Sequence, residues 1–500
     1  MNTLRPVLPV GAECALHDAA QTRVIEQRAA AALPAHALMR RAGESVARLA
    51  LALAPHAQRI WIAAGSGNNG GDGLEAALHL HAAGKQVEVS LLGDAARLPP
   101  DAADALARAQ AAGVAIHGEP APTAAPQLAI DALFGVGASR APEGAFAAAV
   151  QALNALLCPV LAVDLPTGLH AATGQPLGAA CVNASHTLAL LTLKPGLFTG
   201  AGRDHAGVTW FDGLGVDAAA LASPIAWLAG RGMLAPRRHA QHKGSFGDVA
   251  VVGGAPGMAG AALLAARAAH AAGAGRIYLE LLDRSAATPR VDLLHPELMF
   301  RTDWSQGDPE VLAHTTVVCG CGGGDAVRAP LPRLLSTAAR LVLDADALNA
   351  LAADPTLVAL LQARATRGRA TVLTPHPLEA ARLLGVTTAG VQADRLGAAQ
   401  QLADRFACVV VLKGSGSVIA APGEAPRINS TGNASLATAG TGDVLAGWLG
   451  GRWAQAHLVD AAASAFAAAC LAVAEHGAAA EPAPTGALRA GELIERLASF

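Results

Sequence analysis

Apolar runs and helix-forming stretches alternate along most of the chain, and short polar, glycine-rich segments separate them. In the first half, the pattern predicts a helix over 16–54 with a break near Pro34, a buried strand over 59–64 and a helix over 74–83. Further apolar runs predict strands over 86–92, 114–117, 128–134, 159–165, 186–193 and 208–211. This alternation predicts a Rossmann-like, doubly wound α/β sheet with its ligand edge at the carboxyl ends of the strands.

The same alternation resumes in the second half, after the aperiodic segment 214–240. Apolar runs predict strands over 248–252, 276–282, 315–319, 341–343, 371–373 and 408–412, and a helix over 259–272. A chain of 500 residues is too long for one ordinary hydrophobic core. We therefore expect two α/β domains, 1–225 and 226–500.

Composition narrows the classes of partner and compartment. The net charge is −3, with no long basic run, so neither nucleic acid nor an anionic membrane is an expected partner. The seven cysteines are scattered, and Cys319 and Cys321 are better explained as buried small residues than as a zinc site. Free thiols and no recognisable signal peptide favour the cytoplasm. The most apolar helix candidate, 461–474, is too short to span a bilayer.

Polar residues follow several predicted strands of the first half. Gly65-x-Gly67-x-x-Gly70 matches the dinucleotide-binding pattern in form, but Glu88 lies inside a strand instead of at a strand end. The pattern also does not call for two asparagines and an aspartate, whose oxygens suit a ligand or a hard cation. Asp131, Asp164 and the segment 194–196 end other strands. One such aspartate is usually a cap, but several at one sheet edge favour a shared site.

The segments GSGNNGGDG, DALFGVG and VDLPTG occur in the order and spacing of a known family. Residues 16–215 resemble the NAD(P)H-hydrate epimerase domain, the YjeF N-terminal family. The resemblance implies a catalytic Asp164 at the nicotinamide end of the substrate and a potassium ion held by Asn69, Asp131 and Thr167. It also implies substrate contacts by Asn68, Asn69, Gly70, Gly71, Asp72, Gly135, Val136, Gly137, Ala138, Ser139, Arg140, Ala141 and Asp164.

The second half has its own phosphate-sized loop at 438–447, with the sequence TAGTGDVLAG. Glycine amides and a following helix N-terminus suit an anion, and the helix dipole is expected to keep Asp443 ionised as a proton acceptor. An ordinary turn with Asp443 as a cap explains these ten residues equally well. Likewise, His376 alone is typical of a helix cap and Lys413 of a surface charge. Asp344 and Asp346 suit either magnesium or a solvated turn. The GxxxxGK[ST] phosphate loop is absent.

Five segments in order (HKGSFG, LDADALN, LTPHPLEAARLL, VVLKGSGSVI and TAGTGDVLAG) run from about residue 235 toward the C-terminus. They resemble the ADP-dependent NAD(P)H-hydrate dehydratase domain, the YjeF C-terminal family, and imply a ribokinase-like fold. The resemblance implies Mg²⁺ with ADP, and a hydrate site of Ala261, Gly322, Gly324, His376 and a catalytic Asp443. Nucleotide contacts are implied for Lys413, Gly414, Ser415, Gly416, Ser417 and Gly442. The family's Gly-Pro-Gly-Leu-Gly element here reads Gly-Cys-Gly-Gly-Gly over 320–324.

Together the two resemblances imply a bifunctional repair enzyme for hydrated NADH and NADPH. The first domain would interconvert the R and S hydrates. The second would phosphorylate the C6 hydroxyl of the S hydrate at the expense of ADP and eliminate phosphate, with Asp443 as the base. Two alternatives remain at this stage: a ribokinase-like small-molecule kinase with an N-terminal nucleotide-binding module, and an N-terminal domain that only binds. A homo-oligomer is also compatible with the sequence.

Overall fold

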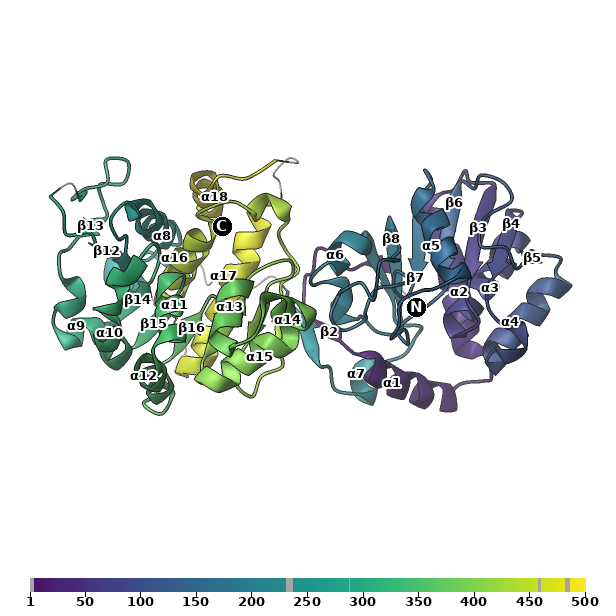
Figure 1. Cartoon of the computed structure of the whole chain (residues 1–500), viewed down its shortest axis with the longest axis horizontal. Helices are drawn as coiled ribbons and strands as arrows, with labels where there is room; N and C mark the ends of the chain where they lie inside the picture. Colours follow the sequence, from purple (N-terminus) through teal and green to yellow (C-terminus); the bar gives the residue numbers. More distant parts are fainter. Residues whose placement is uncertain (1–3, 231–236, 287, 457–459, 482–485) are drawn as a thin grey trace. The chain divides into compact units, whose positions relative to one another are not determined.

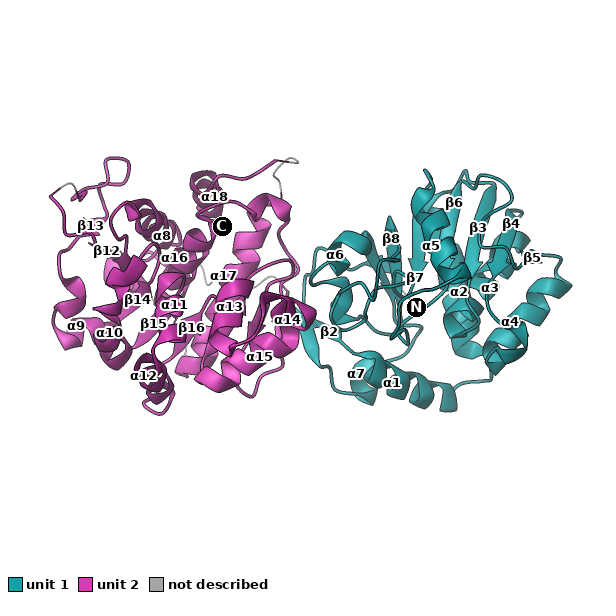
Figure 2. Cartoon of the chain, viewed as in Figure 1, with its two compact units in different colours: residues 1–228 teal, residues 229–500 magenta. Residues whose placement is uncertain are grey.

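The computed structural model describes residues 4–230, 237–286, 288–456, 460–481 and 486–500. The chain forms two compact units, Met1–Leu228 and Ala229–Phe500 (Figure 2). The observed division after Leu228 lies slightly later than the predicted boundary near 225. It lies later because β10 (Ala226–Leu228) pairs antiparallel with β2 (Cys14–Leu16) of the first unit. Residues 231–236 of the aperiodic segment 214–240, where we expected the two domains to meet, lie outside the described residues.

Unit 1 is built on a twisted sheet with the strand order β1-β9-β8-β7-β6-β3-β4-β5 (Figure 1). All neighbours pair in parallel except β1, which is antiparallel to β9. The strands are β1 Arg5–Pro6, β3 Arg59–Ala64, β4 Gln86–Leu91, β5 Ala115–His117, β6 Leu128–Ala132, β7 Val160–Val163, β8 His186–Leu190 and β9 Val208–Asp212. The main helices are α1 Ala19–Ala31, α2 Ala37–Leu53, α3 Asn68–Ala82, α4 Pro100–Ala111 and α5 Ala145–Ala155, followed by the short α6 Gly202–His205 and α7 Ala218–Leu221.

Alternation along β3 fixes which side chains face which layer. Ile60 and Ile62 belong to the core formed with α2, α3 and α4, whereas Trp61 and Ala63 belong to the opposite core with α5. The chain continues from β3 outward to β4 and β5 and then returns to β6 on the other side of β3. The loops after β3 and β6 therefore diverge at a topological switch point, the usual ligand crevice of such sheets.

Unit 2 contains the order β13-β12-β11-β14-β15-β16-β17-β18-β19, parallel through β17 and antiparallel at β18 and β19. Its strands are β11 Asp248–Gly253, β12 Arg276–Leu281, β13 Met299–Phe300, β14 Thr315–Cys319, β15 Arg340–Leu343, β16 Thr371–Leu373, β17 Val409–Leu412, β18 Val418–Ala420 and β19 Arg427–Ile428.

Helices cover both faces of the second sheet, over two separate hydrophobic cores. One face carries α8 Ala259–Ala271, α16 Thr441–Ala454, α17 Ala461–Ala478 and α18 Ala490–Leu497. The other carries α9 Pro309–His314, α10 Leu331–Thr337, α11 Asp346–Ala353, α12 Pro355–Ala365, α13 Pro377–Leu384, α14 Thr388–Ala393 and α15 Arg395–Phe406. The α/β class and the parallel strands expected from the sequence are thus present in both units.

Two predicted helices are wrong in length. The helix after β3 begins at Asn68 instead of 74, so the polar glycine segment is its first turns and not a loop. The apolar helix α17 continues past 474 to Ala478, because Glu475 is accommodated by an ion pair with Arg452. α17 is therefore long and apolar enough to cross a membrane by length and composition, but 56% of that window is buried inside the protein. Its burial, and not its length, is what marks it as a core helix.

Candidate functional sites

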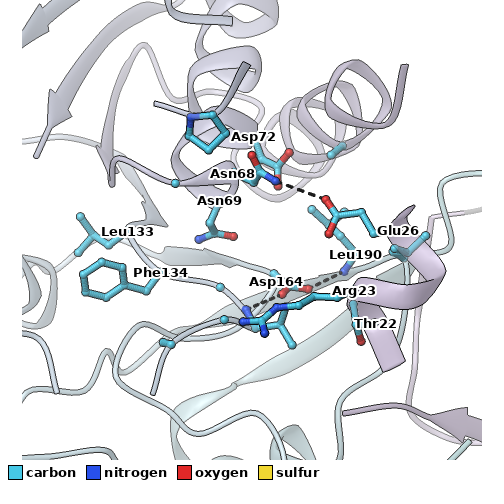
Figure 3. Close-up of a pocket in the computed structure, with 18 of the residues that line it drawn as sticks. Thr22, Arg23, Glu26, Asn68, Asn69, Asp72, Leu133, Phe134, Asp164 and Leu190 are labelled. Carbon is cyan, nitrogen blue, oxygen red and sulfur yellow. Dashed lines mark hydrogen bonds between the residues drawn. The ribbon is translucent and has the colours of Figure 1, made fainter. Parts of the chain in front are cut away.

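The first candidate site is a pocket of about 790 Å³ at the switch point of unit 1. Figure 3 shows its polar side chains converging from α1, from the start of α3 and from the end of β7. Most of the predicted substrate residues line it, namely Asn68, Asn69, Asp72, Gly135, Val136, Gly137, Ala138, Ser139, Arg140, Ala141 and Asp164.

Gly70 and Gly71 are not among the lining residues, and their surroundings explain why the segment is helical. A β-carbon at Gly70 would lie 1.7 Å from the carbonyl oxygen of Gly65, and one at Gly71 would lie 2.6 Å from the Met39 side chain. These glycines let α3 begin directly against the backbone that follows β3. The start of α3, at residues 67–69, consequently lines the pocket, where a helix N-terminus favours an anionic ligand group.

A buried ion pair forms the floor of this pocket. Asp164 has a left-handed backbone (φ +66°), and its carboxylate accepts hydrogen bonds from the Val136 amide (3.1 Å) and from Lys194. The Lys194 ammonium, 1% exposed, also donates to the carbonyl oxygens of Leu190 (2.8 Å) and Thr192 (2.9 Å). The sequence placed Lys194 at a strand end but assigned it no role. Its three acceptors hold it rigidly beside Asp164.

Two further carboxyl groups face Asp164 and hold protons more tightly than usual. Burial, followed by the charge of Asp164, raises the pKa of Glu26. The same two causes raise the pKa of Asp72 well above its ordinary value. Asn68 donates a hydrogen bond to Glu26 (3.4 Å), as Figure 3 shows. The pocket thus combines an ionised pair with carboxyl groups able to donate a proton to a bound hydroxyl.

Of the residues expected to hold a cation, Asn69 lines this pocket, whereas Asp131 and Thr167 are not among its lining residues. Asp131 is fully buried and accepts hydrogen bonds from the Thr167 amide (2.8 Å) and hydroxyl (2.7 Å). Burial raises the Asp131 pKa to about 6. The Thr167 oxygen also accepts from the Phe134 amide (3.0 Å), and Asn69 lies against the adjoining Gly135. Asp131 and Thr167 are therefore in direct contact, and Asn69 is close by on α3.

The second candidate site lies where β14, β15 and β17 end and α16 begins. Donor atoms of Cys321, Asp344 and Asp443 all lie within 4.8 Å of one another. Lys413 donates to Asp344 (2.6 Å), and a β-carbon at Gly442 would lie 3.4 Å from the Lys413 ammonium nitrogen. The solvated alternatives are wrong for Asp344, which is 1% exposed, and for Lys413, whose side chain is 19% exposed.

Burial dominates the electrostatics of Asp443. It raises the Asp443 pKa to about 6, the charge of Asp344 adds to that rise, and a hydrogen bond from the Cys321 thiol lowers it. The expected helix dipole is thus opposed by burial, which shifts the Asp443 pKa upward. At neutral pH the carboxylate is still mainly ionised, and it is a stronger base than an exposed aspartate.

His376 serves as the N-cap of α13. Its Nδ1 accepts from the amides of Leu378 (3.1 Å) and Glu379 (3.4 Å), and Glu379 accepts in return from the His376 amide (2.7 Å). The capping role is thus observed, while the expected substrate contact stays a prediction. The Lys413 amide donates to the carbonyl oxygen of Pro375 (2.9 Å), so the cap adjoins the Lys413 loop.

The loop after β14 closes against the start of α8. A β-carbon at Gly322 would lie 2.9 Å from the Ala261 β-carbon, which brings these two predicted residues together. The Gly324 amide donates to Asp346 (2.8 Å). The oxygen of Gly322 accepts from the Ala255 amide (2.7 Å), so backbone contacts on both sides fix this loop.

Comparison with known proteins matches each half of the chain to a protein family. Residues 35–196 match the model of the YjeF-related protein N-terminus, and residues 249–498 match that of NAD(P)H-hydrate dehydratase. The bifunctional NAD(P)H-hydrate repair enzyme Nnr of Escherichia coli (strain K12) is 37% identical over 469 residues, covering 90% of this chain and 85% of that protein. The protein of that name from Coxiella burnetii is 35% identical, covering 90% of this chain and 92% of its own length.

The chain belongs to the bifunctional NAD(P)H-hydrate repair enzyme family.

A crystal structure of an ADP/ATP-dependent NAD(P)H-hydrate dehydratase from Bacillus subtilis, co-crystallised with ATP and Mg²⁺, is also similar. It is 29% identical, with a TM-score of 0.43, and the match covers 53% of this chain and 92% of that one. Within the family assignment, the Rossmann-like first unit and the ribokinase-like second unit agree with the fold class expected from the sequence.

In this repair enzyme, the Lys413 loop is held by a residue that the sequence did not single out. Gly414 has φ +134°, and a β-carbon there would lie 3.0 Å from the Arg395 guanidinium. Arg395 is 1% exposed and donates to the carbonyl oxygens of Leu412 (3.3 Å) and Lys413 (3.2 Å). Ser415, Gly416 and Ser417 follow, and the Ser417 hydroxyl closes the turn by donating to the Gly414 carbonyl (3.2 Å).

Proposed function

We propose that unit 1 interconverts the R and S hydrates of NADH and NADPH, and that unit 2 dehydrates the S hydrate at the expense of ADP. The observation that carries this proposal is that each unit has its own polar site, built at the carboxyl ends of its own parallel sheet. The unit 1 site holds an ion pair beside two carboxyl groups whose pKa values are raised, and the unit 2 site holds a base beside a helix N-terminus and a lysine. The two sites therefore carry different catalytic groups, which suit two different reactions of the same substrate.

In unit 2, the Asp443 carboxylate takes the proton of the C6 hydroxyl as that oxygen attacks the terminal phosphorus of ADP. The P–O bond to AMP breaks, and the phosphoryl group is left on the hydrate. The amides at the start of α16 stabilise the charge that develops on the phosphoryl oxygens, and Lys413 adds a positive charge. Phosphate then leaves C6 with its bonding electrons while a proton leaves C5, which restores the reduced nicotinamide ring.

Magnesium would accompany ADP at this site. Asp344 and Asp346 offer the oxygen ligands that Mg²⁺ prefers. Asp344 is paired with the Lys413 ammonium. Asp346, at the first position of α11, instead accepts hydrogen bonds from uncharged donors such as the Gly324 amide, and is the carboxylate better placed to take the ion. Bound there, Mg²⁺ would neutralise phosphate charge, as is usual in phosphoryl transfer.

In unit 1, a carboxyl group of Asp72 or Glu26 donates a proton to the C6 hydroxyl, which departs as water with assistance from the ring-nitrogen lone pair. The resulting planar carbon accepts water on either face, and the second addition returns the proton. The Asp164 carboxylate stabilises the positive charge on the ring in between, and the ion pair with Lys194 holds that carboxylate in place. A site that combines a fixed ion pair with carboxyl groups of raised pKa can run this sequence in both directions.

We also propose a potassium ion at Asn69, Asp131 and Thr167. All three residues offer oxygen, which suits a hard, weakly charged ion and disfavours zinc. The Nδ2 atom of Asn69 is buried and finds no hydrogen-bond partner among the described residues. A half-turn of that amide would present its oxygen at this position instead, so the donor set fits a cation. The ion would fix the start of α3 against the loop after β6.

The seven cysteines are all free thiols, which supports a reducing, cytoplasmic location. The overall function is tested by incubating the protein with R and S hydrates, Mg²⁺, potassium and either ADP or ATP, and following the absorbance of reduced nicotinamide. The proposal expects nucleotide-dependent return of the absorbance from both hydrates. Phosphorylated hydrate accumulating as the final product would instead identify the second unit as a kinase.

A further inference from the structure

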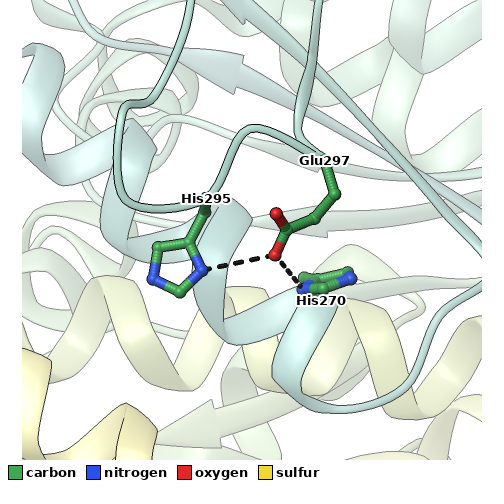
Figure 4. Close-up of side chains that lie close together, drawn as sticks. All are labelled: His270, His295 and Glu297. Atoms are coloured by element: carbon green, nitrogen blue, oxygen red, sulfur yellow. Dashed lines mark ion pairs between the residues drawn. The ribbon is translucent and has the colours of Figure 1, made fainter.

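A cluster of potential metal ligands lies in unit 2, apart from the residues assigned to its chemistry. His270 is in the last turn of α8, while His295 and Glu297 are in the segment between β12 and β13. Figure 4 shows both imidazole rings turned toward the Glu297 carboxylate. The Glu297 Oε1 atom lies 3.4 Å from Nδ1 of His270 and 3.4 Å from Nδ1 of His295. All three donor atoms lie within 4.8 Å of one another.

These separations suit a shared metal ion better than direct ion pairs. A charge-assisted hydrogen bond from nitrogen to a carboxylate is about 2.7–2.9 Å long. Two ligands of a tetrahedral zinc ion, with metal–ligand distances of about 2.0–2.1 Å, lie about 3.4 Å apart. The spacing of 3.4 Å at both histidines therefore matches the edge of a zinc coordination tetrahedron.

Fixed contacts hold the two sides of the cluster together. Arg267, one turn before His270 on α8, donates two hydrogen bonds (2.7 and 2.9 Å) to the carboxylate of Asp292. The Asp292 side chain is 3% exposed and also accepts from the Leu294 amide (3.0 Å). After the ligands, the Leu298 amide donates to the His295 carbonyl (3.1 Å), and Leu298 is buried. The segment is thus anchored to α8 before His295 and to the core after Glu297.

The cluster is also open to solvent and ready to bind. The exposed fractions of the side chains are 42% for His270, 28% for His295 and 43% for Glu297, which leaves room for a water as fourth ligand. Along α8, His270 is nine positions from Ala261, or about 14 Å. The cluster is therefore distinct from the dehydratase site.

We propose that His270, His295 and Glu297 bind one zinc-class divalent ion that fastens residues 292–298 to the end of α8. Two imidazoles and one carboxylate are a ligand set that zinc takes readily. The ion has no part in the dehydration chemistry. Its expected effect is on the stability of unit 2.

The test uses the full chain, freed of metal with a chelator, and compares His295→Ala and Glu297→Gln with the wild type. The matched control is His314→Ala, which removes another unit 2 histidine whose ring nitrogen contacts the Glu310 carbonyl (2.8 Å). Zinc binding is measured by calorimetry and by the melting temperature. Cobalt is then used as a spectroscopic probe of the ligands.

We expect the wild type and His314→Ala to bind one zinc ion at this site and to melt at a higher temperature with zinc. Each ligand variant should bind that ion at least about tenfold more weakly and lose the melting shift. Bound cobalt should show tetrahedral visible bands without a thiolate charge-transfer band, which distinguishes this cluster from one containing Cys321. Equal zinc affinity in wild type and ligand variants, a thiolate band, or no zinc binding by the wild type would each overturn the proposal.

Discussion

Lys413 and Asp344 are joined by a hydrogen bond of 2.6 Å between the ends of β17 and β15. Burial alone would lower the pKa of Lys413, but the charges of Asp344 and Glu379 outweigh it, and the net shift is upward. The lysine is therefore charged at every physiological pH. The pair fixes one positive charge next to Asp443, where a transferring phosphoryl group would lie.

Separating this pair should affect stability and nucleotide binding differently. Lys413→Met leaves a buried aspartate without its partner, and we expect a loss of about 3–5 kcal/mol in the free energy of unfolding of unit 2. Adding Asp344→Asn removes the unpaired charge and should recover most of that loss. The ADP affinity of the double variant should remain lower than that of the wild type, because the contact between Lys413 and the phosphate is missing. Denaturant unfolding and ADP titration measure the two effects. Full ADP affinity in the double variant would contradict the assignment of Lys413.

The role of Asp443 is tested by Asp443→Asn, which preserves the side-chain shape and removes the proton acceptor. Dehydration should fall by about two to four decades, as expected when a general base is lost. ADP binding and epimerisation should be retained. Asp325→Asn is the matched control, because that side chain in the same unit is fully exposed. A dehydration rate near that of the wild type would show that another group accepts the proton.

The dehydration rate should depend on pH through the same residue. Because the Asp443 pKa is raised to about 6, the carboxylate is protonated and inactive below that pH. kcat/KM should therefore rise with pH, about tenfold per unit well below 6, and level off above it. A profile with its acid limb near pH 4 would place the essential base elsewhere.

Cys321 is predicted to affect the pH at which the acid limb of the dehydration profile falls. Its thiol hydrogen bond lowers the Asp443 pKa, so Cys321→Ala should move the acid limb of the profile to higher pH. Cys321→Ser keeps a hydrogen-bond donor and should leave the limb near its original position. Cys319→Ala, a change at a second fully buried thiol, is the control. Equal profiles for Cys321→Ala and the wild type would remove Cys321 from the account.

In unit 1, Lys194→Met should impair epimerisation without affecting dehydration of the S hydrate. The Asp164 carboxylate would lose its buried counter-charge and the contact that fixes it in the pocket. Lys85→Met is the control, since Lys85 is a lysine of the same unit whose ammonium donates to the Pro55 carbonyl (3.1 Å). Epimerisation is followed by separating the two hydrates over time. An unchanged rate in Lys194→Met would mean that this ion pair is purely structural.

The sequence predicted the strands of both sheets well, because buried parallel strands are short apolar runs that end in polar residues. The predicted loop over Asn68–Asp72 is wrong, because the glycines there allow α3 to pack closely against its neighbours instead of forming a loop. The pairings Lys413–Asp344 and Lys194–Asp164 each join residues from different strand ends. A local sequence pattern identifies each of these residues at a strand end, but it does not predict which residue pairs with which.

Other parts of the sites were missed because their signal is tertiary. Glu26 lies on α1, far along the chain from the glycine-rich motifs, and only the fold brings it to Asn68. Nothing in the sequence distinguishes Arg395 from other helical arginines, and only the fold brings it into contact with the Lys413 loop. The division of the chain after Leu228 depends on the pairing of β10 with β2, which join residues from the two ends of unit 1.

The most direct test of the account is complementation between two full-length variants, Asp443→Asn and Asp164→Asn. Each is incubated alone, and then both together, with equal amounts of R and S hydrate, ADP, Mg²⁺ and potassium, while reduced-nicotinamide absorbance is recorded. Asp443→Asn alone should recover almost none, and Asp164→Asn alone should rapidly recover only the S half. The mixture should recover both halves, because the S hydrate diffuses from one protein to the other. Rapid recovery of both hydrates by Asp164→Asn alone, or a mixture no better than that variant, would contradict the division of labour between the two units.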